Sequence, residues 1–329
     1  MSGIGDTPIL EYTRVSDVPR RYRLYGLTLA SPLDLPCRRA PQYARPDVQL
    51  VEGSAAAFAR ARASAALPPG DWFACRKLSR EGLYLRWTGN FEFLVSADGR
   101  SIQYRPLEHA TLESLTVYLL SQVLSFSLLA CGSDPLHGTS VAVGDGAIGF
   151  VGDCGYGKTT LAAALHSRGC PIVTDDLMAL RRRGRDWLVE PGIPRLKLAP
   201  RLARQLLGPR LRDERMIHGT AKRVIQLAAA QTVARALPIR AIYVLEEPRR
   251  TGRIRIAPLG AGDAMLEMVR AAFNLVVRDH ERLAKQFEFA SRLVAGVPVR
   301  RLSYPRAVER LPEICAAVLS DAAALPPRA

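Results

Sequence analysis

The chain has 329 residues, of which 48% are hydrophobic and 23% charged. It is therefore long and apolar enough to bury a sizeable core, in two domains or in one large domain with an appendage. The formal net charge is +15, and nearly all of the positive charge is arginine. Such a surface is either simply solvated or attracts an acidic partner, which could be a nucleotide, an acidic peptide or a nucleic acid.

The cysteines and the apolar stretches argue against a secreted, zinc-binding or membrane protein. None of the six cysteines has CxxC spacing, and no histidine is near enough in sequence to suggest a zinc site. The pattern is typical of free thiols in a reducing cytosol. The N-terminus lacks the features of a signal peptide. The most apolar stretch, residues 115–131, carries several polar side chains and predicts a buried helix. We expect a cytoplasmic protein with no membrane partner.

The first part of the chain predicts an α+β module of short strands. Turn signals containing glycine separate three runs that alternate apolar and polar side chains, which is typical of a meander. No residue in this module suggests a chemical role. In chain order we expect strands at residues 21–30 and 47–51, a helix at 54–66, and strands at 83–87, 91–96 and 101–104.

The second part predicts a nucleotide-binding sheet. A helix at residues 111–129 leads into it and is broken by Asp134-Pro135. A strand, a glycine-rich turn, a helix and another strand then follow in the βαβ order. The expected elements are strands at 139–143 and 147–151, a helix at 158–168, a strand at 171–174, a hairpin turn at 181–185, strands at 239–245 and 253–256, helices at 261–276 and 278–293, a strand at 297–302 and a helix at 307–323.

A phosphate-binding loop lies between the strand at 147–151 and the helix after it. Glycines let the main chain curl so that its N–H groups point at phosphate oxygens, and the following helix directs its positive end at the same anion. Lys158 would reach the β- and γ-phosphates, and the Thr159 hydroxyl would ligate Mg²⁺. The residues expected to bind the nucleotide, which match GxxxxGK[ST] and the position after it, are Gly152, Asp153, Cys154, Gly155, Tyr156, Gly157, Lys158, Thr159 and Thr160.

Two adjacent carboxylates, Asp175 and Asp176, follow the strand after the loop helix. Open α/β sheets place their sites at strand C-termini, so we expect this pair beside the γ-phosphate. One carboxylate could hold Mg²⁺ and the other could accept the proton of an attacking hydroxyl. His137 precedes the strand that leads into the loop, and taken alone it is most simply a structural histidine.

Residues 136–176 resemble the catalytic core of the bacterial HPr kinase/phosphorylase family. His137-Gly138, the loop, Arg168-Gly169 and Asp175-Asp176 stand at the family's spacing without a gap. The resemblance implies protein-serine phosphorylation with ATP and Mg²⁺. It also implies that Asp176 is the base, Lys158 binds phosphate, Thr159 ligates the metal and His137 assists near the transferring group.

The later part of the chain departs from the family pattern. The family's Glu-Ile-Arg-Gly-Leu-Gly segment, which supplies a Mg²⁺-binding glutamate, is absent, and residues 189–200 stand where it would begin. Glu190 is the nearest carboxylate in sequence. Arg195, Lys197, Lys222 and Arg223 are candidates for the cation that phosphoryl transfer needs, and the sequence does not rank them.

We therefore expect two domains: residues 1–131, an α+β module with a bridging helix, and residues 132–329, an α/β P-loop domain of the HPr-kinase type. The segment RLYGLTLASPLDLP resembles the divergent HPr-kinase-like proteins encoded beside lasso-peptide genes, which implies a precursor-peptide substrate. The predicted reaction transfers the γ-phosphoryl group of ATP to a serine of a peptide or small protein. The alternatives are a nucleotide-sensing regulator without phosphotransfer and a small-molecule hydroxyl kinase. A nucleic-acid partner is not favoured, and a homo-oligomer is left open.

Overall fold

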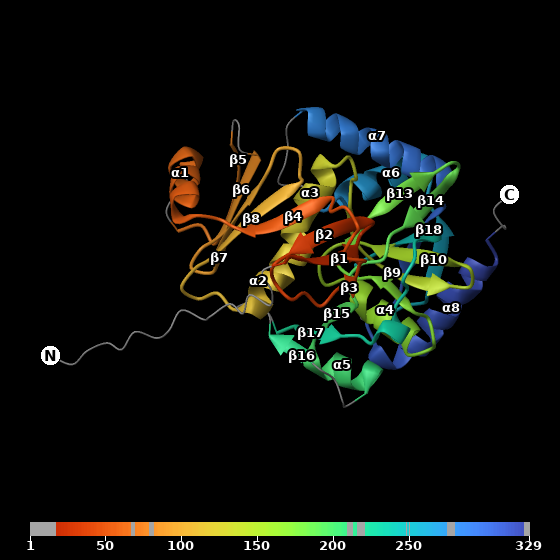
Figure 1. Ribbon diagram of the computed structural model, residues 1–329. Coiled ribbons are helices and arrows are strands. Elements are labelled where there is room, and N and C mark those ends of the chain that lie inside the picture. Colours follow the sequence, from red (N-terminus) through yellow and green to blue (C-terminus); the bar gives the residue numbers. More distant parts are fainter. Residues whose placement is uncertain are drawn as a thin grey trace. The chain divides into compact units, whose positions relative to one another are not determined.

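The computed structural model describes residues 18–66, 70–78, 82–208, 213–215, 221–247, 249, 251–274 and 280–325. The chain, which Figure 1 colours from red at the N-terminus to blue at the C-terminus, divides into two compact units. The first unit ends at Cys131 and the second begins at Gly132, while the short segment Leu24–Gly26 groups with the second.

The first unit is built on an eight-stranded sheet in the order β3-β1-β2-β4-β8-β7-β6-β5. Strands β6, β7 and β8 pair antiparallel with their sequence neighbours, which confirms the predicted meander. Strand β5 was not predicted. The bounds are β1 (Arg20–Leu24), β2 (Leu27–Ser31), β3 (Arg38–Arg39), β4 (Val48–Glu52), β5 (Phe73–Leu78), β6 (Gly82–Trp87), β7 (Phe91–Val95) and β8 (Ser101–Pro106).

The prediction of one strand over residues 21–30 was wrong. The chain turns at Tyr25 and Gly26, whose φ angles are 53° and 79°. Two successive residues with positive φ form the kind of tight turn whose twist matches that of a β-hairpin. The apolar residues continue across this turn, so the sequence pattern alone does not show the break.

Two helical segments belong to the first unit. Helix α1 (Ala55–Ala65) confirms the helix predicted at 54–66, and the Ser54 hydroxyl caps it by accepting from the Ala57 N–H. The predicted bridging helix is also confirmed. It consists of α2 (Leu112–Tyr118), a π-helical turn (Leu119–Val123) and α3 (Leu124–Ala130). By length and composition this helix could span a membrane, but 72% of its most apolar window is buried, as in the core helix of a soluble domain.

The second unit contains a nine-stranded mixed sheet. Strand β10 pairs parallel with β18, and β18 pairs parallel with β20. Strand β9 lies antiparallel between β10 and β11, so β10 and β11 run in the same direction with α4 connecting them. The bounds are β9 (Leu136–Val143), β10 (Gly146–Val151), β11 (Ile172–Thr174), β12 (Leu177–Met178), β13 (Leu180–Arg183), β14 (Asp186–Val189), β18 (Leu237–Leu245), β19 (Arg255–Pro258) and β20 (Val299–Ser303).

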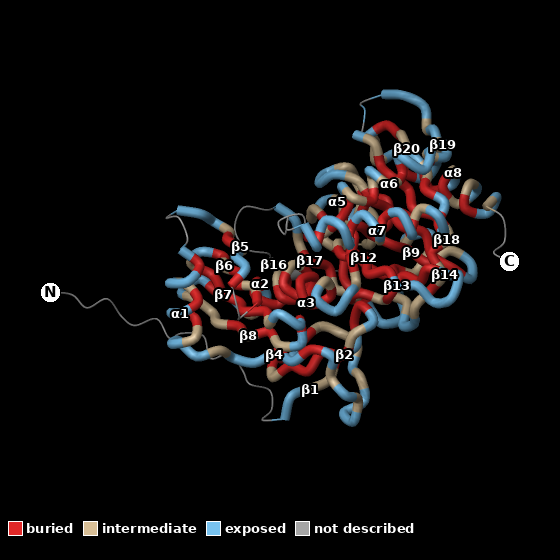
Figure 2. The backbone as a smooth tube through the Cα atoms, turned by 90° about the horizontal axis from the view of Figure 1, so that it is seen from above, coloured by how far each residue is buried: buried red, intermediate tan, exposed pale blue. Residues whose placement is uncertain are grey.

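Helices cover both faces of this sheet. Apolar residues of α4 (Lys158–His166) and α8 (Leu311–Ala323) form one buried cluster with side chains such as Phe150 and Tyr243. Residues of α6 (Ala261–Arg270) and α7 (His280–Gly296) form a second cluster with the alternate side chains, such as Val151 and Ile242. The strands in the middle of the sheet, such as β9 and β10, are consequently buried along most of their length, whereas β13 and β19 near its margins are mostly exposed. Figure 2 shows this contrast between the red tube at β9 and the pale blue tube at β19.

A small three-stranded sheet in the second unit was not predicted. Its order is β15-β17-β16, with β15 (Arg195–Leu198), β16 (Asp213–Arg215) and β17 (Arg223–Gln226), and α5 (Pro200–Leu207) follows β15. The predicted hairpin at 181–185 is confirmed as the β13–β14 turn. Helix α6 ends at Arg270, before the predicted residue 276, and α8 starts at Leu311 after a 3₁₀ turn.

A buried ion pair anchors α7 to the segment just before β9. Both Arg282 Nη atoms donate to the Asp134 carboxylate, at 2.8 and 2.9 Å. The two side chains are only 5% and 8% exposed. Burial raises the pKa of Asp134, although Arg282 acts in the opposite direction. The pair holds the chain at Asp134, two residues before the start of β9 and three residues before His137.

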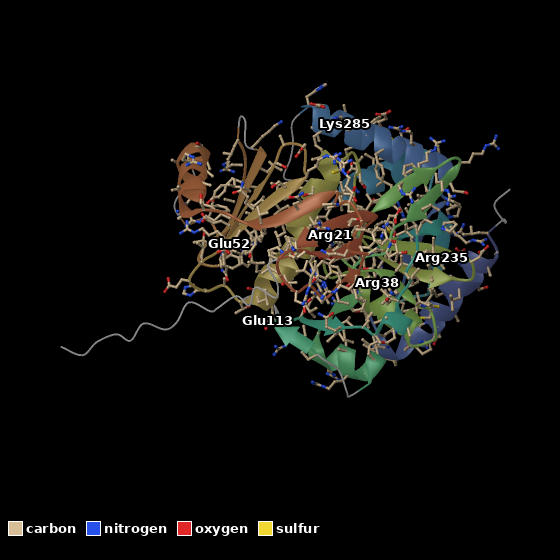
Figure 3. The ribbon with its side chains drawn as sticks, viewed as in Figure 1. Arg21, Arg38, Glu52, Glu113, Arg235 and Lys285 are labelled. Atoms are coloured by element: carbon tan, nitrogen blue, oxygen red, sulfur yellow. The ribbon has the colours of Figure 1, made fainter. Side chains whose placement is uncertain are left out.

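We predict that Asp134→Asn destabilises the protein by about 3 kcal/mol, because it leaves a buried guanidinium without its counter-charge. The change would be measured as a lower free energy of unfolding in urea. Lys285→Gln on the same helix is the control, since Lys285 projects outward (Figure 3) and its pair with Glu281 is exposed. Its cost should stay below about 0.5 kcal/mol. Equal effects of the two substitutions would contradict the role given to Asp134.

Candidate active site

The glycine-rich loop joins the C-terminal end of β10 to α4, as predicted. Gly157 is the N-cap of α4 and has a φ of 97°, a conformation that other residues rarely adopt. A Cβ atom at this position would lie 2.6 Å from the Tyr304 hydroxyl. That hydroxyl donates to the Tyr156 carbonyl at 2.7 Å. Tyr304, which directly follows β20, therefore holds the curled loop in place.

Several main-chain N–H groups of this loop are available to a ligand. Within the described residues, the N–H groups of Gly155, Gly157, Lys158, Thr159 and Thr160 have no hydrogen-bond acceptor. The last three begin α4, where the helix geometry leaves such groups unpaired and the dipole is positive. Converging unpaired donors at the start of a helix are what an anion requires.

Lys158 lies inside the loop and is 7% exposed. Its Nζ donates to the carbonyls of Gly152 and Asp153, at 2.7 and 3.1 Å. Burial lowers the pKa of Lys158, while Cys154 and the two aspartates act to raise it. The ammonium therefore contacts neutral carbonyls, which a phosphate could replace with a charge-assisted bond.

Asp175 joins three elements through one buried carboxylate. Its Oδ1 accepts from the Thr139 hydroxyl of β9 at 2.7 Å and from the Thr159 hydroxyl of α4 at 2.8 Å. Its Oδ2 accepts from the main-chain N–H of Lys197 in β15, at 2.9 Å. The carboxylate is thus fixed against the loop threonine, where the sequence placed it.

Asp176 faces a different set of groups. Its φ angle is 73°, so the chain reverses there and its side chain diverges from that of Asp175. Lys197 Nζ donates to the Asp176 Oδ2 at 2.6 Å. The main-chain carbonyl of Asp176 accepts from the Gly138 N–H at 3.2 Å. The His137 Nδ1 lies 3.7 Å from its Oδ1. A left-handed conformation at a residue other than glycine is costly and is common at functional sites.

His137 is oriented by the same residue. Its Nδ1 lies 3.1 Å from the Asp176 carbonyl oxygen, which can only accept, so Nδ1 carries a proton in this contact. Burial lowers the pKa of His137, with Asp176 acting in the opposite direction and Lys158 in the same one. The ring is therefore neutral near pH 7, and Nε2 is its acceptor. Phe273 packs edge-on against the ring at 5.6 Å between centroids.

Electrostatics keep Asp176 ionised. Burial raises its pKa, but Lys197, His137 and Arg195 lower it, and the net result is a pKa far below the usual range of an aspartate. Among the cations that the sequence left unranked, Lys197 is thus in direct contact with the site. Arg195 also acts to lower the pKa of Asp176, and Lys222 acts to lower the pKa of Lys158.

Two other sequence candidates gain less support. Glu190, considered as a replacement for the missing glutamate, is buried and accepts from Arg181 Nε at 2.7 Å. Its charge is therefore already balanced by a partner. Arg223 pairs in register with Leu198 across the β15–β17 ladder. The sequence gives no signal for the placement of Arg223, because it depends on a sheet that no pattern predicts.

A cavity of about 770 Å³, here called the active-site cavity, opens beside the loop. His137 and the loop residues Gly152, Asp153, Cys154 and Tyr156 line one part of it. The ends of β18 and α6, with Phe273, line the rest. The cavity thus brings the loop and the histidine to one space, and its size suits a ligand larger than a single phosphate.

Thr159 and Asp175 offer the hard oxygen atoms that Mg²⁺ prefers. Three hydrogen bonds already occupy Asp175, and within the described residues no group of three or more His, Cys, Asp or Glu side chains could hold a metal. The residues therefore fit an ion that nucleotide phosphates and water hold for the most part, with Thr159 as protein ligand and Asp175 behind it.

No protein-family model and no curated protein matches the chain. One similar solved structure is that of the Hpr(Ser) kinase/phosphatase from Coxiella burnetii, with 12% sequence identity and a TM-score of 0.33, covering 57% of this chain and 95% of that one. A kinase is thus among the structural neighbours, and the function proposed below depends on the geometry of the site instead.

We predict that Lys197→Met raises the pKa of Asp176, because the substitution removes the principal stabilising charge and leaves the burial. The titration of the Asp176 carboxyl carbon, followed by NMR, measures this directly. Because the folded pKa is lowered, Asp176 contributes stability above its unfolded pKa of about 3.9, and this is lost as the pH falls. The variant should lose part of that contribution at neutral pH.

Lys285→Met is the matched control, since it removes the same charge from an exposed position on α7. It should leave the Asp176 titration where it is in the unmodified protein. A titration that does not move in Lys197→Met would show that the Lys197–Asp176 contact does not control this carboxylate.

Proposed function

We propose that this protein is an ATP-dependent kinase that transfers the γ-phosphoryl group to a serine hydroxyl of a peptide or small protein. One observation carries the proposal: unpaired main-chain donors at the start of α4 lie in the same site as an ionised, lysine-held carboxylate and a neutral histidine. The donors suit a polyphosphate, and the carboxylate and histidine suit a hydroxyl.

The contacts of the loop, Lys158 and Thr159 support the roles that we propose for them in binding the phosphates. The N–H groups of the loop would bind the β- and γ-phosphates, and Lys158 would leave its carbonyl partners to neutralise them. The Thr159 hydroxyl already donates to Asp175, so its lone pair is available to Mg²⁺. That ion, when bound, supplies charge neutralisation between the phosphates.

On the acceptor side, Asp176 and His137 would orient the serine hydroxyl. Phosphoryl transfer passes through a loose transition state, and the hydroxyl becomes acidic only late in it. A carboxylate of low pKa is a weak base, but it can hold the hydroxyl in line and accept the proton at that stage. Lys197 would then balance charge beside the transferring group, which is the task given to an arginine in other phosphotransferases.

Nucleotide binding can be tested without knowing the acceptor. Cys154 is an exposed, free thiol inside the loop, and Cys131 is an exposed, free thiol outside it. We predict that ATP with Mg²⁺ protects Cys154 from alkylation by iodoacetamide and leaves Cys131 reactive, as measured by peptide mass spectrometry. Lys158→Ala should abolish the protection, because the lysine binds the phosphates.

If ATP slowed the alkylation of both thiols equally, or if Lys158→Ala retained the protection, the loop would not be the nucleotide site. The internal control removes any general effect of ATP on the reagent.

Transfer is tested with γ-labelled ATP and serine-containing peptides. We predict that Asp176→Asn lowers label transfer by about 10²-fold to 10⁴-fold, the range typical of a group that assists proton transfer. Asp145→Asn is the control, because Asp145 is 90% exposed and lies in the turn at the opposite end of β10. It should retain full activity.

Nucleotide protection without transfer to any serine peptide would favour the sensor alternative. Label on hydroxylated metabolites but not on peptides would favour a small-molecule kinase. Either result would overturn the peptide-kinase proposal.

A further inference from the structure

A second cavity, here called the arginine cavity, lies at the C-terminal ends of β18 and β20. Its volume is about 400 Å³. The paired strands β19 and β20 form one side of it, and Tyr304, which also holds the phosphate loop, lies at its border. Its charged lining residues are Arg249, Arg253, Arg255, Arg301 and Glu246.

Two of these arginines project from one face of the β19–β20 ladder. Arg255 is opposite Ser303, and Ala257 is opposite Arg301, and all four residues line the cavity. Arg255 and Arg301 are therefore diagonal neighbours on the same face, with no carboxylate between them in the ladder. Like charges at such positions repel unless an anion lies between them.

The charge of the arginine cavity is largely unbalanced. Its only carboxylate is Glu246, which lies 3.6 Å from Arg301. The side chains of Arg249, Arg253 and Arg255 have no partner in the part of the chain that the structure describes. The active-site cavity differs, because four carboxylates line it against three arginines.

The two cavities are neighbours that share three lining residues. Glu246, Arg249 and Arg301 border both of them. A ligand that places a hydroxyl near His137 in the active-site cavity could therefore extend past these residues into the arginine cavity. Such a ligand needs a neutral reacting end and an anionic part farther along.

We propose that the arginine cavity binds an acidic segment, rich in aspartate or glutamate, of the peptide that the active site phosphorylates. The inference rests on the proposed function and adds the class of substrate. Carboxylates supply the charge that the arginines lack, and guanidinium groups bind carboxylates in a bidentate manner. A neutral purine base does not supply that charge, so the nucleotide is a poorer match for this cavity.

The test measures binding without turnover. A fluorescein-labelled oligoglutamate peptide containing one serine is titrated by anisotropy in the presence of Mg²⁺ and a non-hydrolysable ATP analogue. We expect the double substitution Arg253→Gln/Arg255→Gln to weaken binding by about tenfold, roughly threefold for each exposed charge. The matched oligoglutamine peptide should bind weakly to both proteins.

Arg235→Gln is the control for the loss of an exposed arginine outside the cavity. Arg235, which is labelled in Figure 3, is exposed and lies just before the N-terminal end of β18. The arginine cavity lies beyond the C-terminal end of that strand. The control should bind the oligoglutamate peptide as the unmodified protein does. Affinity for the ATP analogue, measured in parallel, should be the same in all three proteins.

Three results would overturn the proposal. They are equal peptide binding by the double variant and the unmodified protein, an equal loss in Arg235→Gln, and a parallel loss of affinity for the ATP analogue, which would assign the cavity to the nucleotide. Because no phosphoryl transfer is measured, a failure here is separate from a failure of the kinase proposal, which the labelled-ATP experiment reports.

Discussion

The candidate site depends on one buried carboxylate, that of Asp175. It accepts hydrogen bonds from Thr139 in β9, from Thr159 in α4 and from the main chain of Lys197 in β15. A buried carboxylate without hydrogen-bond partners would be strongly unfavourable, so the fold requires these three elements to meet at Asp175. Asp175 thereby holds the start of α4, strand β9 and the small three-stranded sheet in one arrangement.

Much of this arrangement could be predicted from the sequence because its signals are local. The loop consists of consecutive residues, and the order of strand, loop, helix and strand follows from apolar runs and glycines. Asp175 and Asp176 adjoin a strand end, so their position beside the loop follows from the sheet rule. The left-handed turn at Asp176, which separates the two carboxylates, has no comparable signal, since aspartate is common in many conformations.

The contribution of Lys197 could not be predicted because it is a long-range effect. Lys197 is 21 residues from Asp176 in sequence, on a strand whose partners come from still later in the chain. In a chain with 46 lysines and arginines, a single cation carries no pattern. The single strand predicted over residues 21–30 was wrong for a different reason. The apolar run continues through a turn that only the backbone angles of Tyr25 and Gly26 show.

Both lysines of the site contact acceptors that belong to the protein itself. Lys158 rests on two carbonyls, so a phosphate can replace neutral acceptors with a charged one at little cost. Lys197 rests on a carboxylate, so a hydroxyl that approaches Asp176 must share or displace a stronger contact. In the proposed kinase, the phosphate-binding side would therefore be ready before the acceptor side. This asymmetry favours an order in which nucleotide binds first and its charge then draws Lys197 from Asp176, which frees the carboxylate only when a phosphoryl group is present to be transferred.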